Sequence, residues 1–109
     1  MSTPPPELAR WEPAGGGAQR FIVSGDLDYS AHDRVIAAMW TRAPGSVPRV
    51  EIDLGAVGFF DTSIARILEL YRVEAAHHEA EVRVVNPSRI PLMVLQLAGL
   101  SALLGPGPA

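Results

Sequence analysis

Hydrophobic and acidic residues alternate in the segment VEIDL, Val50 to Leu54, with the two-residue period of a strand that buries one face. The alternation stops near residue 55, so we expect the following GAVGFF to be a connection. From Ile64 onward, apolar residues recur at three- and four-residue spacing, which predicts a helix running to about residue 77 or 80. This strand and this helix are expected to form the centre of the fold.

Shorter strand patterns lie on both sides of that centre. Residues 8–13 and 19–24 (QRFIVS) are short runs, and three glycines at 15–17 supply a turn between them, so we expect an N-terminal hairpin. The β-branched run VRVV at 82–85 predicts another strand. The last segment, 100–109, is long enough for one short strand.

Capping residues and apolar spacing predict two more helices. Ser30, with Asp33 three residues later, resembles a capping box at the start of a helix of about twelve residues that ends before Pro44. Ser88 is placed to cap a third helix, which Gly99 stops. The residues expected to form the apolar side of the third helix are Ile90, Val94, Leu95 and Leu97.

Strands that alternate with helices predict an α/β domain with a largely parallel sheet and an antiparallel hairpin at its front. A chain of 109 residues can bury one core, so we expect a single domain over residues 8–104. Residues 1–7 contain three consecutive prolines and are expected to be a flexible lead-in. Residues 105–109 are expected to be a flexible tail.

Charge and composition exclude several classes of function. The net charge is −3 and all nine basic residues are scattered arginines, which argues against nucleic-acid binding. There is no cysteine, so no disulfide or thiolate chemistry is expected. Apolar stretches are far shorter than the ~20 residues that a membrane span needs, and no secretory signal is visible. We therefore expect a cytoplasmic protein without membrane insertion.

Two acidic loops are the candidate functional residues. Asp26 and Asp28 precede the first helix, and Asp61, Thr62 and Ser63 precede the second. Both loops follow strands and introduce helices, so they are expected to share one rim of the sheet. Capping of the helices explains these residue types. The alternative is that a hydroxyl there accepts a phosphate that switches a docking surface, and the spacing alone leaves both interpretations open.

Catalysis finds little support in the sequence. No His or Glu stands at metal-ligand spacing from the candidate carboxylates, and no Gly-rich phosphate loop follows a strand. His77 and His78 are adjacent, so on a helix they point about 100° apart and cannot share one metal ion. We expect a protein that is not an enzyme and that uses no metal and no cofactor.

Three motifs in order, GDLDYSA, EIDLGAVGFFDTS and VRVVNPS followed by LMVLQLAGL, resemble those of the STAS domain family, named for sulfate transporters and anti-sigma factor antagonists. The resemblance covers about residues 8 to 104. It implies a mixed, largely parallel sheet of four to five strands with three helices. It also implies a domain shortened at the C-terminus, because many members continue into a final helix.

For a short stand-alone member, the resemblance implies an anti-sigma factor antagonist. Such proteins bind an anti-sigma factor, often a serine/threonine kinase, which inactivates them by phosphorylation. The usual acceptor position falls on Thr62, with Ser63 as the fallback. Ile64 stands where the family usually has Gly, so its side chain is expected to crowd a kinase or to extend a binding patch. The residues expected to bind the partner are Asp26, Asp28, Asp61, Thr62, Ser63 and Ile64.

Two other roles in the same family remain open from the sequence. One is a STAS subunit that binds the ATPase of a lipid-transport complex. The other is a scaffold piece of a stress-signalling assembly that is not phosphorylated. The sequence leaves the oligomeric state undetermined.

Overall fold

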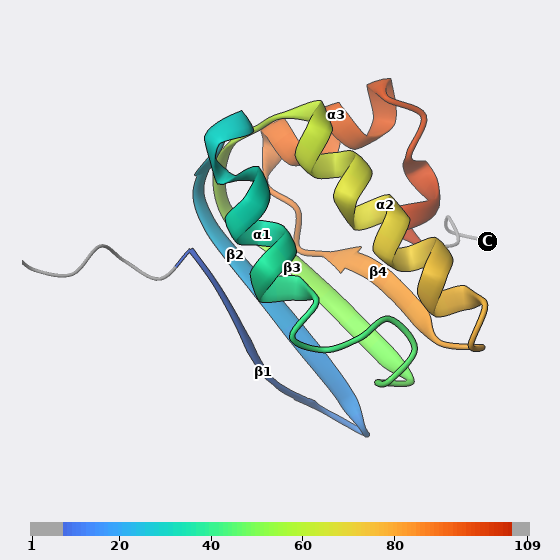
Figure 1. Cartoon of the computed structure of the whole chain (residues 1–109). Coiled ribbons are helices and arrows are strands. Elements are labelled where there is room, and N and C mark those ends of the chain that lie inside the picture. Colours follow the sequence, from blue (N-terminus) through green and yellow to red (C-terminus); the bar gives the residue numbers. More distant parts are fainter. Residues whose placement is uncertain (1–7, 106–109) are drawn as a thin grey trace, which may run out of the picture.

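A single four-stranded sheet with helices against one of its faces organises the chain in a computed structural model, which describes residues 8–105 (Figure 1). The strands are β1 (Ala9–Gly15), β2 (Ala18–Leu27), β3 (Arg49–Phe60) and β4 (Glu81–Val85). The helices are α1 (His32–Met39), α2 (Thr62–Ala76) and α3 (Arg89–Leu97), with 3-10 turns η1 (Tyr29–Ala31) and η2 (Ser101–Leu104). None of these helices is long and apolar enough to cross a membrane.

The order of the strands in the sheet is β1-β2-β3-β4, so β3 is an interior strand as its sequence predicts. Strands β1 and β2 pair antiparallel, whereas β2 with β3 and β3 with β4 pair parallel. Gly15, Gly16 and Gly17 all have positive φ, which lets the hairpin between β1 and β2 close. The prediction of a largely parallel α/β sheet with an antiparallel hairpin at its front is confirmed.

The interpretation of GAVGFF as a connection is wrong, because β3 continues through it to Phe60. Strand β2 also runs further than expected, to Leu27, and its last residues pair with this part of β3. Register shifts between Ile22 and Ser24 and between Gly25 and Leu27 interrupt the pairing. Such bulges break the two-residue alternation, so the sequence pattern ended before the strand did.

Two predicted helix starts are also wrong in detail. The first helix is the η1 turn followed by α1, and Asp28 rather than Ser30 caps it through a side-chain oxygen. Ser88 is the N-cap residue of α3 as predicted, but its side chain makes no cap bond and its hydroxyl contacts the carbonyls of Leu54 and Val57 on β3. A capping hydroxyl accepts a backbone N–H of its own helix, whereas this one donates to a neighbouring strand.

The expected fifth strand does not form among the described residues. The segment after α3 is the 3-10 turn η2, whose Leu103 is fully buried. Gly105, expected in the tail, ends this turn with φ 77°. The predictions for residues 1–7 and 106–109 lie outside the described residues.

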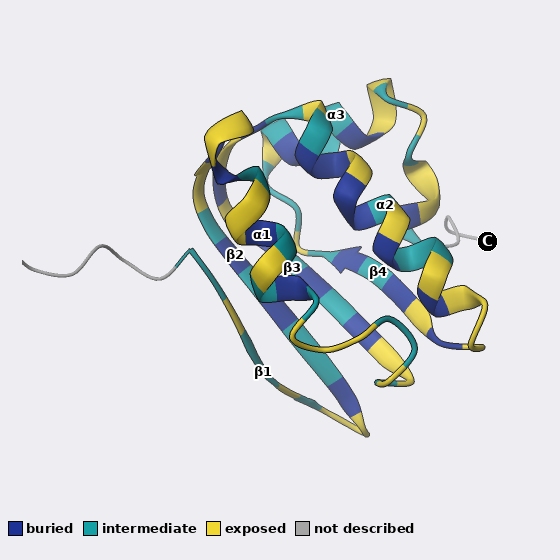
Figure 2. Ribbon diagram, viewed as in Figure 1, coloured by how far each residue is buried: buried dark blue, intermediate teal, exposed yellow. Residues whose placement is uncertain are grey.

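The core lies between the sheet and the helices (Figure 2). The predicted apolar face of α2 is confirmed, since its members are all buried: Ile64, Ile67, Leu68, Tyr71 and Ala75. Ile52 of β3 is fully buried opposite this face. The Tyr71 hydroxyl donates to the carbonyl oxygen of Arg42 at 2.8 Å, and burial raises the pKa of Tyr71 to about 12.

The other face of the sheet carries a row of charges. Glu12, Arg20, Glu51 and Arg83 are in register on the four successive strands, so acid and base alternate across the sheet. Arg20 and Glu51 form an ion pair at 2.8 Å. These side chains are half-buried, and no helix covers them.

Candidate functional site

The carboxyl ends of β2 and β3 meet at one rim of the molecule, as predicted. The Asp61 N–H, just after β3, donates to the Leu27 carbonyl at the end of β2 at 2.9 Å. The Asp26 carboxylate accepts the N–H of Phe59 at 3.1 Å. A side chain at Gly58 would stand 2.8 Å from the same carboxylate oxygen, so a glycine there leaves room for this bond. Asp26 therefore joins two strands rather than belonging to a loop.

Asp28 serves the turn that follows. Its carboxylate accepts the backbone N–H of Ser30 at 2.9 Å and also the Ser30 hydroxyl. The capping interpretation of Asp28 is therefore supported by direct contacts. Tyr29, which lies between Asp28 and Ser30 in the sequence, is 71% exposed and stacks on His32 with ring centroids 5.5 Å apart.

Asp61 caps α2. Its Oδ1 accepts the backbone N–H of Ser63 at 2.7 Å. The Ser63 hydroxyl and the Ser63 backbone N–H together hold the pKa of the Asp61 carboxyl below its usual range. The backbone N–H acts through a hydrogen bond to the carboxylate, whereas the hydroxyl makes no hydrogen bond and acts only as a nearby dipole. The carboxylate therefore stays ionised at the positive end of the helix.

The two adjacent hydroxyls lie in different environments. Thr62 is the first residue of α2 and is exposed. The Ser63 hydroxyl oxygen is buried and makes no hydrogen bond. A reagent from solution can therefore reach Thr62 directly, whereas Ser63 requires the helix start to open.

The prediction that Ile64 meets a partner is wrong for this conformation. Its side chain is fully buried in the core. The first turn of α2 points this residue inward, where it packs with the sheet instead of extending a surface. An isoleucine in place of the family glycine therefore leaves the exposed side of the helix start unchanged.

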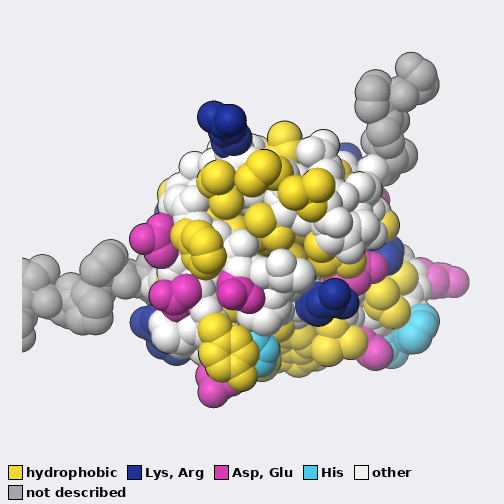
Figure 3. All heavy atoms as spheres, turned by 90° about the horizontal axis from the view of Figure 1, so that it is seen from above, with side chains coloured by type: hydrophobic (Ala, Val, Ile, Leu, Met, Phe, Trp, Pro, Cys, Tyr) yellow, Lys and Arg dark blue, Asp and Glu magenta, His cyan; other side chains and the backbone are white. Residues whose placement is uncertain are grey.

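An apolar furrow between α2 and α3 begins at Thr62. One hollow of about 240 Å³ lies beside Thr62, and a second of about 280 Å³ continues along α2, with Arg66 lining both. The side chains that form this α2–α3 furrow are Thr62, Arg66, Glu69, Leu70 and Val73 with Val94, Leu97, Ala98 and Leu100. Leu97 is 82% exposed and Leu70 54%. Figure 3 shows hydrophobic side chains gathered on this end of the molecule, with acidic side chains along one border.

Within residues 8–105, no three His, Asp or Glu side chains are grouped so as to hold a metal ion. The rim acids instead make hydrogen bonds to backbone N–H groups. The site thus offers a row of carboxylates, an exposed threonine hydroxyl at a helix start and an apolar furrow, which suits contact with another protein more than chemistry on a small molecule.

Comparison with known proteins gives the family. The family model described as "Mlab, STAS domain" matches residues 13–105, most of the chain. The chain belongs to the STAS domain family. A search of curated proteins found no match.

Solved structures of anti-sigma factor antagonists share this STAS fold. One from Mycobacterium paratuberculosis has a TM-score of 0.78 at 23% identity, covering 93% of this chain and 85% of its own. SpoIIAA in its unphosphorylated form has a TM-score of 0.74 at 20% identity, covering 92% and 88%. The phosphorylated form of the Bacillus cell fate determinant SpoIIAA has a TM-score of 0.69 at 20% identity, covering 92% and 91%.

The sequence did not predict the α2–α3 furrow, because Leu97 was expected on the same apolar side of the third helix as Leu95. In the structure Leu95 is fully buried, whereas Leu97 is the most exposed large hydrophobic residue of residues 8–105. The sequence of α3, RIPLMVLQL, is apolar around most of its circumference. A helix that packs on one side only must then leave apolar side chains outside, and this excess was the available signal.

Proposed function

We propose that this protein is an anti-sigma factor antagonist, a binding module that docks a kinase-type anti-sigma factor and is released when Thr62 is phosphorylated. The observation that carries the proposal is the exposed Thr62 hydroxyl at the start of a 15-residue helix, beside the apolar α2–α3 furrow. One neighbour of the same fold, SpoIIAA, is described in unphosphorylated and phosphorylated forms.

The helix start can accept a phosphate without unfolding. A phosphate on Thr62 adds about −1.5 to −2 charges at the end of α2 where the helix dipole is positive. Arg66 lies one turn further along the helix and lines the same hollow. Its side chain has no ion-pair partner among residues 8–105, so it is free to approach the new phosphate.

The transfer itself needs no group from this chain other than the acceptor. The Thr62 oxygen would attack the γ-phosphorus of ATP held by the kinase, ADP would leave, and the hydroxyl proton would pass to a base of the kinase. The Ser63 hydroxyl is a poor competitor because its oxygen is buried.

The added charge would weaken binding by repulsion and desolvation. Asp26, Asp28 and Asp61 already make this rim acidic, and the furrow beside Thr62 is apolar. A partner that covers the furrow would have to bury a dianion that the single charge of Arg66 balances only in part. Loss of several kcal/mol of binding free energy is expected from burying such an incompletely paired charge.

The test compares charge at Thr62 with the same charge elsewhere. Thr62→Glu is expected to weaken binding to a kinase-type anti-sigma factor from the same genome at least about tenfold, measured by calorimetry. Thr41→Glu is the matched control, because Thr41 is also exposed but lies after α1. Equal affinity of the Thr62→Glu variant and the wild type would contradict the proposal.

A second role, the STAS subunit of a lipid-transport complex that binds an ATPase, is favoured by the name of the matching family model, which refers to Mlab. A scaffold that is not phosphorylated would use the furrow equally well. Both roles need the furrow and neither needs a phosphate. Binding that depends on Leu97 but is indifferent to Thr62→Glu would favour them over the switch.

A further inference from the structure

Strand β4 forms an open edge of the sheet within residues 8–105. It pairs only with β3, and η2 packs near it. The Glu81 N–H points toward β3, where it donates to the Pro48 carbonyl at 2.9 Å. Because successive residues of a strand direct their N–H and C=O groups to opposite sides, those of Val82 and Val84 point to the open edge. Open edges of this kind accept another strand unless something prevents it.

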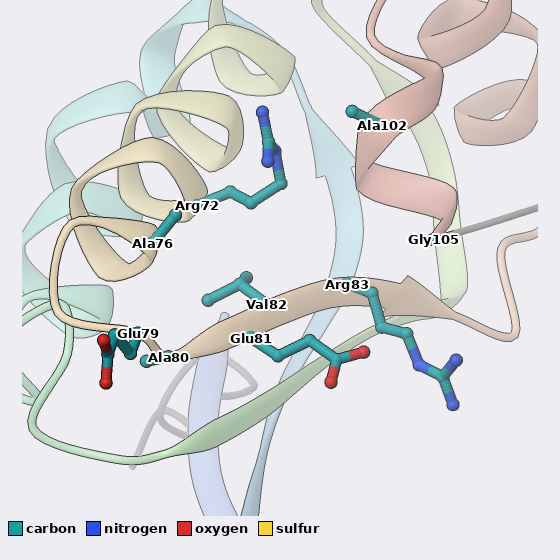
Figure 4. A pocket seen from close by; sticks show the side chains of 9 residues that line it. All are labelled: Arg72, Ala76, Glu79, Ala80, Glu81, Val82, Arg83, Ala102 and Gly105. Carbon is teal, nitrogen blue, oxygen red and sulfur yellow. The ribbon is translucent and has the colours of Figure 1, made fainter.

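The side chains of β4 divide cleanly between two faces (Figure 4). The side chain of Val82 leaves the strand on one side and those of Glu81 and Arg83 on the other, and all three residues line a hollow of about 480 Å³ between α2, β4 and η2. Neither Glu81 nor Arg83 has an ion-pair partner in the described part of the chain. The edge strand therefore presents one acid and one base, two residues apart, on its helix-free face.

Arg83 also ends the charge row of the sheet. The row runs Glu12, Arg20, Glu51, Arg83 from β1 to β4, and each member lies beside a residue of opposite sign. At the open edge this alternation stops on a positive charge. The next strand that would extend it must place a carboxylate beside Arg83.

We propose that the edge of β4 pairs with β4 of a second copy of this chain, antiparallel, with Val82 opposite the other copy's Val82. In this register Glu81 of each copy faces Arg83 of the other, so two ion pairs form at once. The pair is of the hydrogen-bonded kind, because the N–H and C=O groups of Val82 point to the open edge, and its Cα atoms lie about 5.5 Å apart. Val82 of both copies extends the apolar layer on the helix side.

The charges select this register over its neighbours. A shift that centres the pair on residue 83 places Arg83 against Arg83, which is repulsive. A shift that centres it on residue 84 places Arg83 against Val85 and leaves Glu81 unpaired. Within the chosen register the alternation also continues into the second copy, because Glu81 lies beside Arg49 in its own sheet.

A strand of five residues gives a small interface, so the dimer is expected to depend on protein concentration. The proposal does not use Thr62 or the α2–α3 furrow. It is therefore independent of the proposed function, and either can fail without the other.

Charge exchange tests the register. Sedimentation velocity over a concentration series is expected to show a dimer for the wild type and at least about tenfold weaker dimerisation for Arg83→Glu, because both contacts become acid against acid. The double variant Glu81→Arg/Arg83→Glu restores opposite charges in this register and is expected to recover the dimer. Arg34→Glu on α1 is the control for net charge, since Arg34 is exposed and distant in the fold.

A monomer at every concentration for the wild type would overturn the proposal, as would unchanged dimerisation of Arg83→Glu or failure of the double variant to recover. Thermal melting of each variant establishes that it is folded.

Crosslinking provides a second measurement. The chain has no cysteine, so a single introduced one can form a disulfide only with another copy. Val82→Cys is expected to give a covalent dimer on mild oxidation, because opposed Cα atoms of a hydrogen-bonded pair lie about 5.5 Å apart, within disulfide range. Val84→Cys is the matched control, because residue 84 faces residue 80 of the other copy. Equal crosslinking of the two variants would contradict the register.

Discussion

Helix α2 has two apolar sides, and only one of them is covered. Its inner side, with Ile64, Leu68 and Tyr71, is fully buried against the sheet. Its outer side begins at the exposed Thr62 and continues through Leu70, which is 54% exposed. The same kind of residue therefore stabilises the fold on one side of the helix and remains available to a partner on the other.

This difference separates residues that hold the domain together from residues that we propose contact another protein. Removing an inner side chain leaves a cavity or a buried mismatch, so stability falls. Removing an outer side chain changes little in the isolated protein, because that surface already faces water. Mutations on the two sides should therefore divide into those that change stability and those that change binding.

The largest effect is expected where the sheet meets the inner side of α2. Ile52→Asp places a carboxylate without a partner in the core, and an effect above about 4 kcal/mol is expected because the charge is buried unpaired. A loss of this size removes most of the free energy of unfolding of a small domain. Circular dichroism and urea unfolding measure it. A cooperative transition close to that of the wild type would show that the core lies elsewhere.

A pair of leucines two residues apart on α3 sharpens the comparison. Leu95→Ala is expected to cost about 2–5 kcal/mol, because Leu95 is fully buried. Leu97→Ala is expected to change the free energy of unfolding by less than about 0.5 kcal/mol, because Leu97 is 82% exposed. If the proposed function is correct, Leu97→Ala weakens binding of a kinase-type anti-sigma factor. Equal unfolding midpoints for the two variants would contradict the assignment of the furrow.

Tyr71 gives a smaller, pH-dependent effect on the inner side. Its pKa is raised from 10.0 to about 12 in the fold, so folding favours the neutral hydroxyl. Its contribution is complete below pH 10 and is lost as the pH rises toward 12. Because the chain has no lysine, few other groups titrate in this window. The free energies of unfolding of the wild type and of Tyr71→Phe, measured at a series of pH values between about 8 and 12, give the difference.

The Tyr71→Phe variant is expected to lose about 1 kcal/mol near neutral pH, because the hydrogen bond to the Arg42 carbonyl is removed. The decline that Tyr71 causes at high pH should be absent from it. Parallel pH profiles for the two proteins would show that the hydroxyl is not held neutral by the fold.

Periodicity predicted the parts of this fold that bury one face. The alternation in VEIDL located the interior strand, and the helical spacing from Ile64 located the inner side of α2. The end of β3 was missed because bulges in its pairing with β2 disrupt the alternation. The role of Ser88 was missed because its acceptors, the carbonyls of Leu54 and Val57, come from a strand distant in sequence.

The candidate site was predicted where local chemistry determined it. The cap at Asp61 follows from residue type and position, and its contact with Ser63 agrees. The apolar excess of α3 indicates that some of its side chains stay outside the core, but the local pattern does not show which ones, so it could not locate the furrow. The difference between Leu95 and Leu97 arises only when α3 packs against the rest of the domain.

The most direct test of the account is the position of the phosphate. The wild type, Thr62→Ala and Ser63→Ala are incubated with a kinase-type anti-sigma factor and ATP, and intact mass and peptide mapping locate any phosphate. The account predicts one phosphate on Thr62 in the wild type and in Ser63→Ala, and none in Thr62→Ala. A phosphate on Ser63, or a complex that phosphorylation leaves intact, would contradict it.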